Sequence, residues 1–388
     1  MTARPSDCLC AGLAALAFAA SADAVQDCEV NGQHVNPANG YTTQDKTGIM
    51  RCKDRDSGQL VREQELRAGK FVGIVRYYKD AKLEREHSVN ERGNRDGRAR
   101  EFGPGGQVLR DETYRDGSLV GLGRAWHANG KLRRVAFHAE RELAHAEWTE
   151  GGQLRELRCA DKPVLAPDVD DAQLCGHGGK PSTVEFFSER GVLRARTVYQ
   201  AGAIVRQESF WDNGKPSAQE ETADGKRVER TFSREGVKRK EVHWLLRGKE
   251  RIVEREQEFH ETGPLVTERR WVAGERGAEL AAEQSFYLNG QPRRKAEYGG
   301  SGAERTADVS EFHDNGTPAF RGRYVVEGRY RERPVGTHQR FDDQGRLRRE
   351  SFYDARGRIT RERELNESGA VVRDDELFED GSRRAYAK

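Results

Sequence analysis

Hydrophobic and polar residues alternate along most of the chain, in short segments that end at glycine-containing turns. In "RTVYQ" (196–200) and "RRESFYD" (348–354), charged residues alternate with apolar ones or threonine. A period of two places successive side chains on opposite faces of a strand. Helix is disfavoured, because a glycine about every twelve residues would cost about 1 kcal/mol per site in a helix interior. The pattern predicts an all-β chain with strands of about five or six residues.

An aromatic residue four positions before a glycine recurs along the chain and sets the register of the expected strands. "WHANGKLRR" (126–134) and "FDDQGRLRR" (341–349) are two examples. The turn glycines of this pattern are Gly106, Gly130, Gly152, Gly191, Gly214, Gly236, Gly263, Gly290, Gly316 and Gly345. The matching aromatic anchors are Phe102, Trp126, Trp148, Phe187, Phe210, Phe232, Phe259, Phe286, Phe312 and Phe341. The usual step between the glycines is 22 to 29 residues, and near the C-terminus glycines recur every twelve.

The turns carry the residues that tight hairpins require. Asn-Gly, Asp-Gly and Gly-Gly pairs supply the positive φ of such turns. We expect each aromatic anchor to pack on its equivalent in the next repeat, since a slip of one residue would turn a whole strand's side chains to the wrong faces. The predicted fold is an elongated antiparallel β-hairpin repeat ribbon of the solenoid type, with a single continuous sheet.

The composition argues against a thick hydrophobic core. Of 388 residues, 35% are hydrophobic and 34% are charged, and 67 basic residues face 65 acidic ones for a net charge of +2. Finely mixed charges on neighbouring strands can pair at roughly 0.2 to 1 kcal/mol each, so many weak pairs are expected to supplement small apolar contacts. Basic residues form no uncompensated stripe of the kind that nucleic-acid binding needs, so nucleic acid is not a predicted partner.

The N-terminus has the features of a secretory signal peptide. The apolar run "CLCAGLAALAFAASADA" (8–24) is too short to span a bilayer and ends in the small-residue signal Ala22-Asp23-Ala24. We predict a signal peptide over residues 1–24, cleaved after Ala24. The expected location is the periplasm or the outside of the cell.

Export changes the interpretation of the cysteines. Removal of residues 1–24 leaves Cys28, Cys52, Cys159 and Cys175, an even number in an oxidising compartment. Four cysteines allow three connectivities, and we favour Cys28–Cys52 with Cys159–Cys175, because closure of short loops is most probable. The predicted organisation is a disulfide-closed segment over 25–70, followed by hairpin repeats over 71–388 with a loop insertion at Cys159–Cys175.

Candidate catalytic and metal-binding residues are sparse. No nucleophile elbow, zincin, phosphate-loop or dinucleotide-binding motif occurs. His138 and His145 are seven apart and would point to opposite faces of a strand, and His177 near Cys175 is a lone zinc candidate. "DVDDAQL" (168–174) lacks the glycine and distal glutamate of an EF-hand loop. We therefore predict no metal site, no cofactor, no catalytic residue and no enzymatic activity.

The repeat pattern resembles a known family. F/Y-x-x-N-G-K/Q-L-R followed by Y-x-D-G-x-x-x-G, clearest at 126–133 and 114–121, is similar to bacterial MORN-repeat variants labelled YwqK-type antitoxins. The resemblance covers about residues 71–388 and departs at Ala81, which replaces a turn glycine, and at prolines 216, 292 and 318. It implies β-hairpin repeats and an interaction role.

The leading functional hypothesis is a non-catalytic exported repeat scaffold that binds another protein or an envelope component. One alternative is an immunity or antitoxin-like protein that neutralises a toxin acting outside the cytoplasm. A second alternative is binding to phospholipid at a membrane surface. A hydrolase or lectin using the repeat face would need exposed aromatic residues flanked by carboxylates. The identity of the partner and the oligomeric state do not follow from the sequence.

Overall fold

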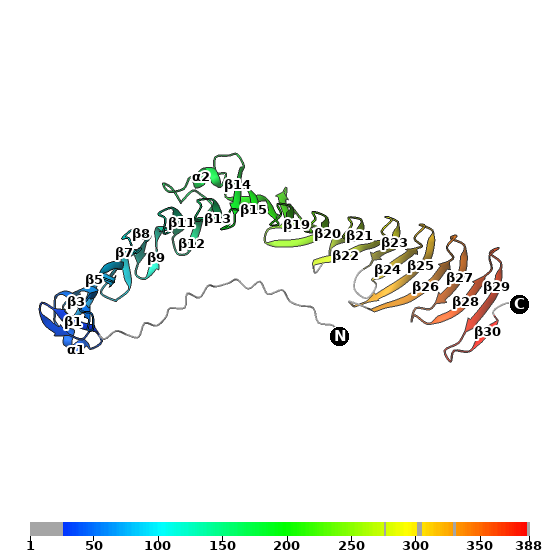
Figure 1. Cartoon of the computed structure of the whole chain (residues 1–388). Coiled ribbons are helices and arrows are strands. Elements are labelled where there is room, and N and C mark those ends of the chain that lie inside the picture. Colours follow the sequence, from blue (N-terminus) through cyan, green and yellow to red (C-terminus); the bar gives the residue numbers. More distant parts are fainter. Residues whose placement is uncertain (1–25, 275–276, 301–304, 329–330, 386–388) are drawn as a thin grey trace. The chain divides into compact units, whose positions relative to one another are not determined.

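The structure is a computed structural model that describes residues 26–274, 277–300, 305–328 and 331–385 (Figure 1). It is almost entirely antiparallel β-sheet, with two helices of four residues each, α1 (Gly40–Thr43) and α2 (Asp171–Leu174). The predicted all-β antiparallel class is confirmed. The signal peptide predicted over 1–24 lies outside the described residues. No helix in the described ranges is long and apolar enough to cross a membrane.

The chain divides into two compact units. The first comprises the described residues up to Gly152 together with 156–158 and 167–169, and the second comprises 153–155, 159–166 and the described part of 170–388. The first sheet has thirteen strands in the order β13-β12-β11-β10-β8-β7-β6-β5-β4-β3-β1-β2, with β9 paired to β8. Its strands are β1 (Gln26–Val30), β2 (Gln33–Val35), β3 (Gly48–Asp54), β4 (Leu60–Arg67), β5 (Lys70–Lys79), β6 (Lys82–Val89), β7 (Arg95–Phe102), β8 (Val108–Arg115), β9 (Ser118–Leu119), β10 (Gly121–Trp126), β11 (Leu132–His138), β12 (Glu142–Trp148) and β13 (Leu154–Arg158).

The second sheet has seventeen strands, β14 to β30, and their order in the sheet is their order in the chain. Figure 1 shows this succession of hairpins from β19 onwards. The strands are β14 (Ser182–Phe187), β15 (Leu193–Gln200), β16 (Ala203–Phe210), β17 (Pro216–Ala223), β18 (Lys226–Phe232), β19 (Lys238–Arg247), β20 (Glu250–Phe259), β21 (Leu265–Gly274), β22 (Gly277–Phe286), β23 (Pro292–Gly299), β24 (Thr306–Phe312), β25 (Pro318–Glu327), β26 (Arg331–Phe341), β27 (Leu347–Tyr353), β28 (Ile359–Leu365), β29 (Val371–Leu377) and β30 (Arg383–Ala385).

The prediction of a single continuous sheet is wrong, because the strands form two separate sheets. The interruption lies where the chain leaves β13 and passes through the segment 159–181, which contains α2 and no strand. Pro163 and Pro167 in this segment lack the N–H that a strand needs to extend a ladder. The hairpin repeat therefore stops there and begins again at β14.

The recurring aromatic-glycine turn has one geometry throughout. Each of the ten turn glycines has a positive φ, between +76° and +107°. The register of the ladder shifts by one residue at the aromatic anchor in nine of these hairpins, which marks a β-bulge. A glycine in the left-handed region closes such a bulged turn without steric cost.

Shorter turns alternate with the bulged ones along much of the chain. Two-residue turns such as Asp224-Gly225 and Asp80-Ala81 have positive φ at both central positions, which is typical of type I′ hairpins. Ala81 stands where the repeat has glycine, yet its φ is +59°. The backbone thus keeps the turn conformation at the cost of a strained alanine.

Asparagine side chains tie successive turns together. Asn213 donates from Nδ2 to the carbonyl of Arg234 in the next bulged turn (2.8 Å) and accepts from the N–H of Lys215 (3.0 Å). The same pair of bonds is made by three further asparagines that precede a turn glycine, Asn129, Asn289 and Asn315. These contacts order turns that are two strands apart.

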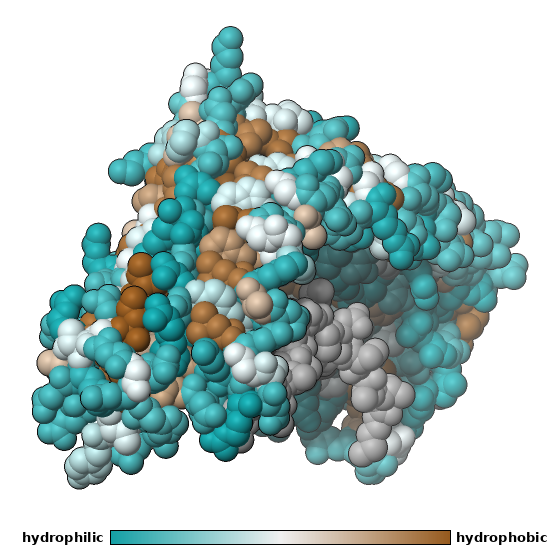
Figure 2. Space-filling view, turned by 60° about the vertical axis from the view of Figure 1, so that its left-hand side comes forward, coloured by the Kyte–Doolittle hydropathy of each residue, from teal (hydrophilic) through white to brown (hydrophobic). Residues whose placement is uncertain are grey.

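The apolar core is thin and divided into small clusters. In the first unit, one buried cluster surrounds a disulfide and contains Cys28, Val30, Val35, Met50, Cys52 and Leu66. In the second unit, another contains Ala296, Ala307, Val309 and Phe320. On the face drawn in Figure 2, hydrophobic residues form small patches among hydrophilic ones. This matches the composition, which offers few apolar residues to bury.

Candidate binding face

The structure contains both predicted disulfides. Cys28 bonds to Cys52 and Cys159 to Cys175, which is the nearest-neighbour pairing. The first bridge is buried between β1 and β3, and the second closes the segment that separates the two sheets. Two disulfides indicate an oxidising, extracytoplasmic environment.

The aromatic anchors lie at the strand ends, but they do not stack on one another. All ten are half-buried, and among the described residues no ring contact joins two of them. Within each sheet, successive anchors are two strands apart, about 10 Å, which exceeds the 4.5–7 Å of a ring pair. A basic side chain on the intervening strand lies over the ring instead. Lys238 Nζ, for example, lies 4.3 Å from the Phe259 ring centroid. Arg196, Lys295 and Arg321 lie similarly over the anchors Phe210, Phe312 and Phe341.

The two candidate histidines lie closer together than the sequence predicts. His138 ends β11 and His145 lies on β12, and a tight turn joins the strands. The carboxylate of Glu142 lies 2.6 Å from His145 Nδ1 and 3.8 Å from His138 Nε2. The prediction that they point to opposite faces of one strand is wrong, because the turn places them on separate strands.

The three aspartates of the 168–174 segment have separate partners. Asp168 pairs with Arg124 at 2.7 Å, and Asp170 caps α2 by accepting from the N–H of Gln173 at 3.0 Å. Buried Asp171 accepts from the N–H of Val164 and from that of Leu165. Within the described part of the chain, no three His, Cys, Asp or Glu side chains are grouped to hold a metal ion.

A continuous line of polar side chains crosses one face of the second sheet. One residue from each of sixteen strands, β14 to β29, stands directly opposite the next, and we call this set the polar row. Its members are Glu185, Arg196, Glu208, Gln219, Arg230, Glu241, Gln257, Glu268, Gln284, Lys295, Ser310, Arg321, Gln339, Glu350, Arg363 and Asp374. Directly opposite residues share a face of the sheet, so the row is one uninterrupted polar strip.

Neighbours in the polar row bond to each other. Arg196 pairs with Glu185 at 2.8 Å, and the amides of Gln257 and Gln339 donate to Glu268 (2.6 Å) and Glu350 (3.0 Å). Such cross-strand contacts contribute roughly 0.2–1 kcal/mol each. Many of them together hold the strands in register where an apolar core is thin.

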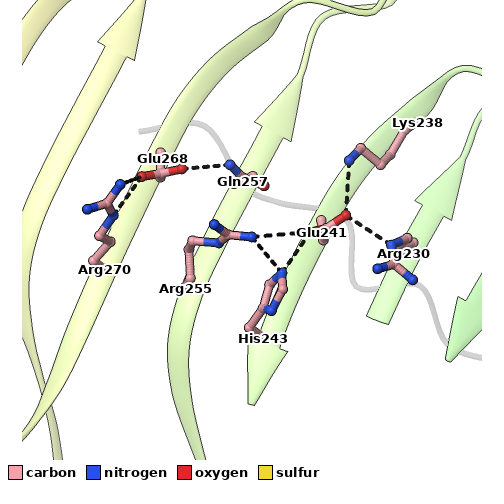
Figure 3. Close-up of polar contacts among 8 residues, drawn as sticks. All are labelled: Arg230, Lys238, Glu241, His243, Arg255, Gln257, Glu268 and Arg270. Atoms are coloured by element: carbon pink, nitrogen blue, oxygen red, sulfur yellow. Dashed lines mark hydrogen bonds and ion pairs between the residues drawn. The ribbon is translucent and has the colours of Figure 1, made fainter. Parts of the chain in front are cut away.

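Glu241 is the most heavily bonded member of the row (Figure 3). Its side chain is only 9% exposed, and one oxygen accepts from Arg230 Nε (3.0 Å) and Lys238 Nζ (2.9 Å). The other oxygen lies 2.7 Å from His243 Nε2 and 3.5 Å from Arg255 Nη2. Burial alone would raise the pKa of Glu241, but hydrogen bonds from His243, Lys238 and Arg230 outweigh it and lower this pKa to about 2. Glu241 is therefore a permanent anion, which holds the side chains of Arg230, Lys238 and His243 in place.

The comparisons with known proteins assign no family. No family model matches the chain, and no curated protein matches it. Among solved structures, a chain of the TcdB2-TccC3-Cdc42 crystal structure is 11% identical, covering 94% of this chain and 21% of that one with a TM-score of 0.14. A chain of the Photorhabdus luminescens Tc holotoxin pore is also 11% identical, with 92% and 20% coverage and a TM-score of 0.16.

A third similarity is to a putative 6-phosphogluconolactonase from Bacteroides uniformis, 12% identical with coverage of 84% and 90% and a TM-score of 0.11. This chain spans about a fifth of the length of the two toxin chains. TM-scores this low carry no argument about fold or function.

Proposed function

We propose that this chain is a non-catalytic exported repeat scaffold of the MORN-like type, and that the face carrying the polar row binds another protein or an envelope component. The observation that supports this proposal is the row itself, which lines up hydrogen-bonding side chains from sixteen strands on one face. Repeat proteins commonly use such extended surfaces for binding. The ion pairs of the row hold its side chains in fixed positions before a partner arrives, which lowers the entropy cost of association.

The proposal is tested by capture with the mature chain after cross-linking in a periplasmic extract. The row variant Gln284→Arg/Ser310→Arg places two bulky charges in the polar row. The matched control Thr231→Arg/Ser285→Arg adds the same charge at two positions on the other face of the sheet, which, like those of the row variant, each stand opposite a basic residue and not opposite each other. We expect the wild type and the control to capture the same proteins or envelope polymers, and the row variant to lose them.

Two results contradict the proposal. One is recovery of nothing by the wild type above beads without protein. The other is equal capture by the row variant and the control, which would mean that the polar row does not form the binding face.

A further inference from the structure

Three basic side chains stand in line on the face that carries the polar row. His243 on β19 is directly opposite Arg255 on β20, and Arg255 is directly opposite Arg270 on β21. We call these three residues the basic triplet. Their side chains are 28%, 37% and 59% exposed. Arg255 and Arg270 carry like charges directly opposite each other, which destabilises a sheet unless anions lie close to them.

Arg255 has few partners for its hydrogen-bond donors. Its Nη2 lies 2.9 Å from His243 Nε2, and that ring nitrogen is also 2.7 Å from Glu241. One ring nitrogen cannot both donate to the carboxylate and accept from the guanidinium. The anion favours a proton on Nε2, which leaves Arg255 only the 3.5 Å contact to Glu241 among the residues that the structure describes. Most of its five N–H donors therefore remain available.

The carboxylates beside the basic triplet are too few to neutralise the cations around it. Glu268 pairs with Arg270 at 2.6 Å. Glu241 forms ion pairs with Arg230, Lys238 and Arg255. None of these three has another ion pair within the described ranges. Two buried carboxylates, Glu241 and Glu268, are thus shared by four permanent cations: Arg230, Lys238, Arg255 and Arg270. Two positive charges remain in excess. Figure 3 shows Arg230 and Lys238 on one side of Glu241, and His243 and Arg255 on the other.

We propose that the basic triplet binds the carboxylates of an acidic segment of a partner protein. This inference rests on the proposed function, and it names the chemistry of the partner at one place on the binding face. Planar guanidinium groups match carboxylates in a bidentate manner. Arg255 and Arg270 lie one strand spacing apart, about 5 Å, on an open sheet face that an extended segment can follow. Two carboxylates would neutralise the two excess charges.

A labelled hexaglutamate peptide serves as the probe, and its binding is measured by fluorescence anisotropy at low salt. We expect Arg255→Gln and Arg270→Gln each to weaken binding at least fivefold. Arg323→Gln is the matched control, because Arg323 lies in line with the basic triplet on the same face and is equally exposed at 59%. Arg323 and Asp308 pair one to one at 2.6 Å, four strands away from Arg270 and from the cations that share Glu241 and Glu268, so this variant should stay within twofold of the wild type.

Absence of wild-type binding, or an equal loss in all three variants, overturns the inference. A third outcome is that the chain binds vesicles containing phosphatidic acid, with the same dependence on Arg255 and Arg270, but does not bind the peptide. In that case the ligand is a phosphate and the acidic-segment assignment is wrong. If hexaglutamate binding fails while capture by the wild type and its loss in the row variant persist, the scaffold function stands and only this inference falls. If capture fails while the peptide result holds, the scaffold function falls.

Discussion

Replacement of Glu241 by glutamine tests how the polar row holds the second sheet together. Glutamine keeps the size of the side chain, but it removes the charge that Arg230, Lys238 and Arg255 share. A pKa lowered from 4.5 to about 2 corresponds to roughly 3 kcal/mol in favour of the folded state. The cations around Glu241 are partly solvated, which reduces this contribution. We expect Glu241→Gln to lower the free energy of unfolding by about 1–3 kcal/mol.

The same substitution changes the dependence of stability on pH. The pKa of Glu241 is lower in the folded state than its ordinary value of 4.5. Its stabilisation is therefore fully present above pH 4.5 and is lost as the pH falls towards about 2. Glu241→Gln should remove this part of the acid sensitivity.

Urea unfolding at pH 6 and at pH 3, followed by tryptophan fluorescence, measures both effects. Trp244 and Trp271 lie on β19 and β21 and report on this region. Glu261→Gln, in an exposed turn, is the control that removes one negative charge elsewhere. Equal unfolding curves for Glu241→Gln and Glu261→Gln at both pH values would refute the reasoning, since the carboxylate would then contribute nothing beyond its net charge.

Three further predictions concern the turns and the second disulfide. Ala81→Gly should raise the unfolding free energy of the first unit by about 0.5–1 kcal/mol in urea titrations. The relief of left-handed backbone strain exceeds the cost of the higher conformational entropy that glycine gives the unfolded chain. No gain in stability would contradict the positive φ of this residue. Asn213→Ala removes two hydrogen bonds of a turn and should lower the free energy of unfolding by about 1–2 kcal/mol. Amide hydrogen exchange should become faster at the turn that follows, and unchanged exchange there would argue against turn-to-turn bonding. Cys159→Ser/Cys175→Ser opens a loop between residues 16 apart and should cost about 3 kcal/mol, measured as a fall in melting temperature under oxidising conditions that leave Cys28–Cys52 intact. An unchanged melting temperature would contradict a stabilising role for this bridge.

The local features of the fold could be predicted from the sequence. Glycines such as Gly130 and Gly345 have positive φ where the repeat requires it, because a bulged turn of this kind depends on a few adjacent residues. The pairing Cys28–Cys52 and Cys159–Cys175 followed from short loop closure for the same reason.

The polar row could not be predicted, because it depends on which residues stand opposite each other on different strands. Every bulge adds one residue to one strand, so the register after Phe232 or Phe259 cannot be counted from strand lengths alone. The same limit explains the expected stacking of aromatic anchors, which overlooked the strand between them. A basic residue on that intervening strand, close to the level of the aromatic anchor, is the signal that could have indicated the cation contacts. The error over His138 and His145 has another cause: the turn at 139–141 contains no glycine, so the repeat pattern does not reveal it.

The second sheet adds strands strictly in chain order, so that the polar row crosses it without interruption. Spin labels on Ser209→Cys and Ser285→Cys test it directly, because six successive pairings connect these two residues. Six strand spacings correspond to about 29 Å between the two backbone positions. Pulsed electron resonance should give one narrow distance distribution near this value. A distribution centred below about 20 Å, or one spread over several separate distances, would contradict the serial sheet, since six spacings of 4.7–4.9 Å leave no room for so short a path.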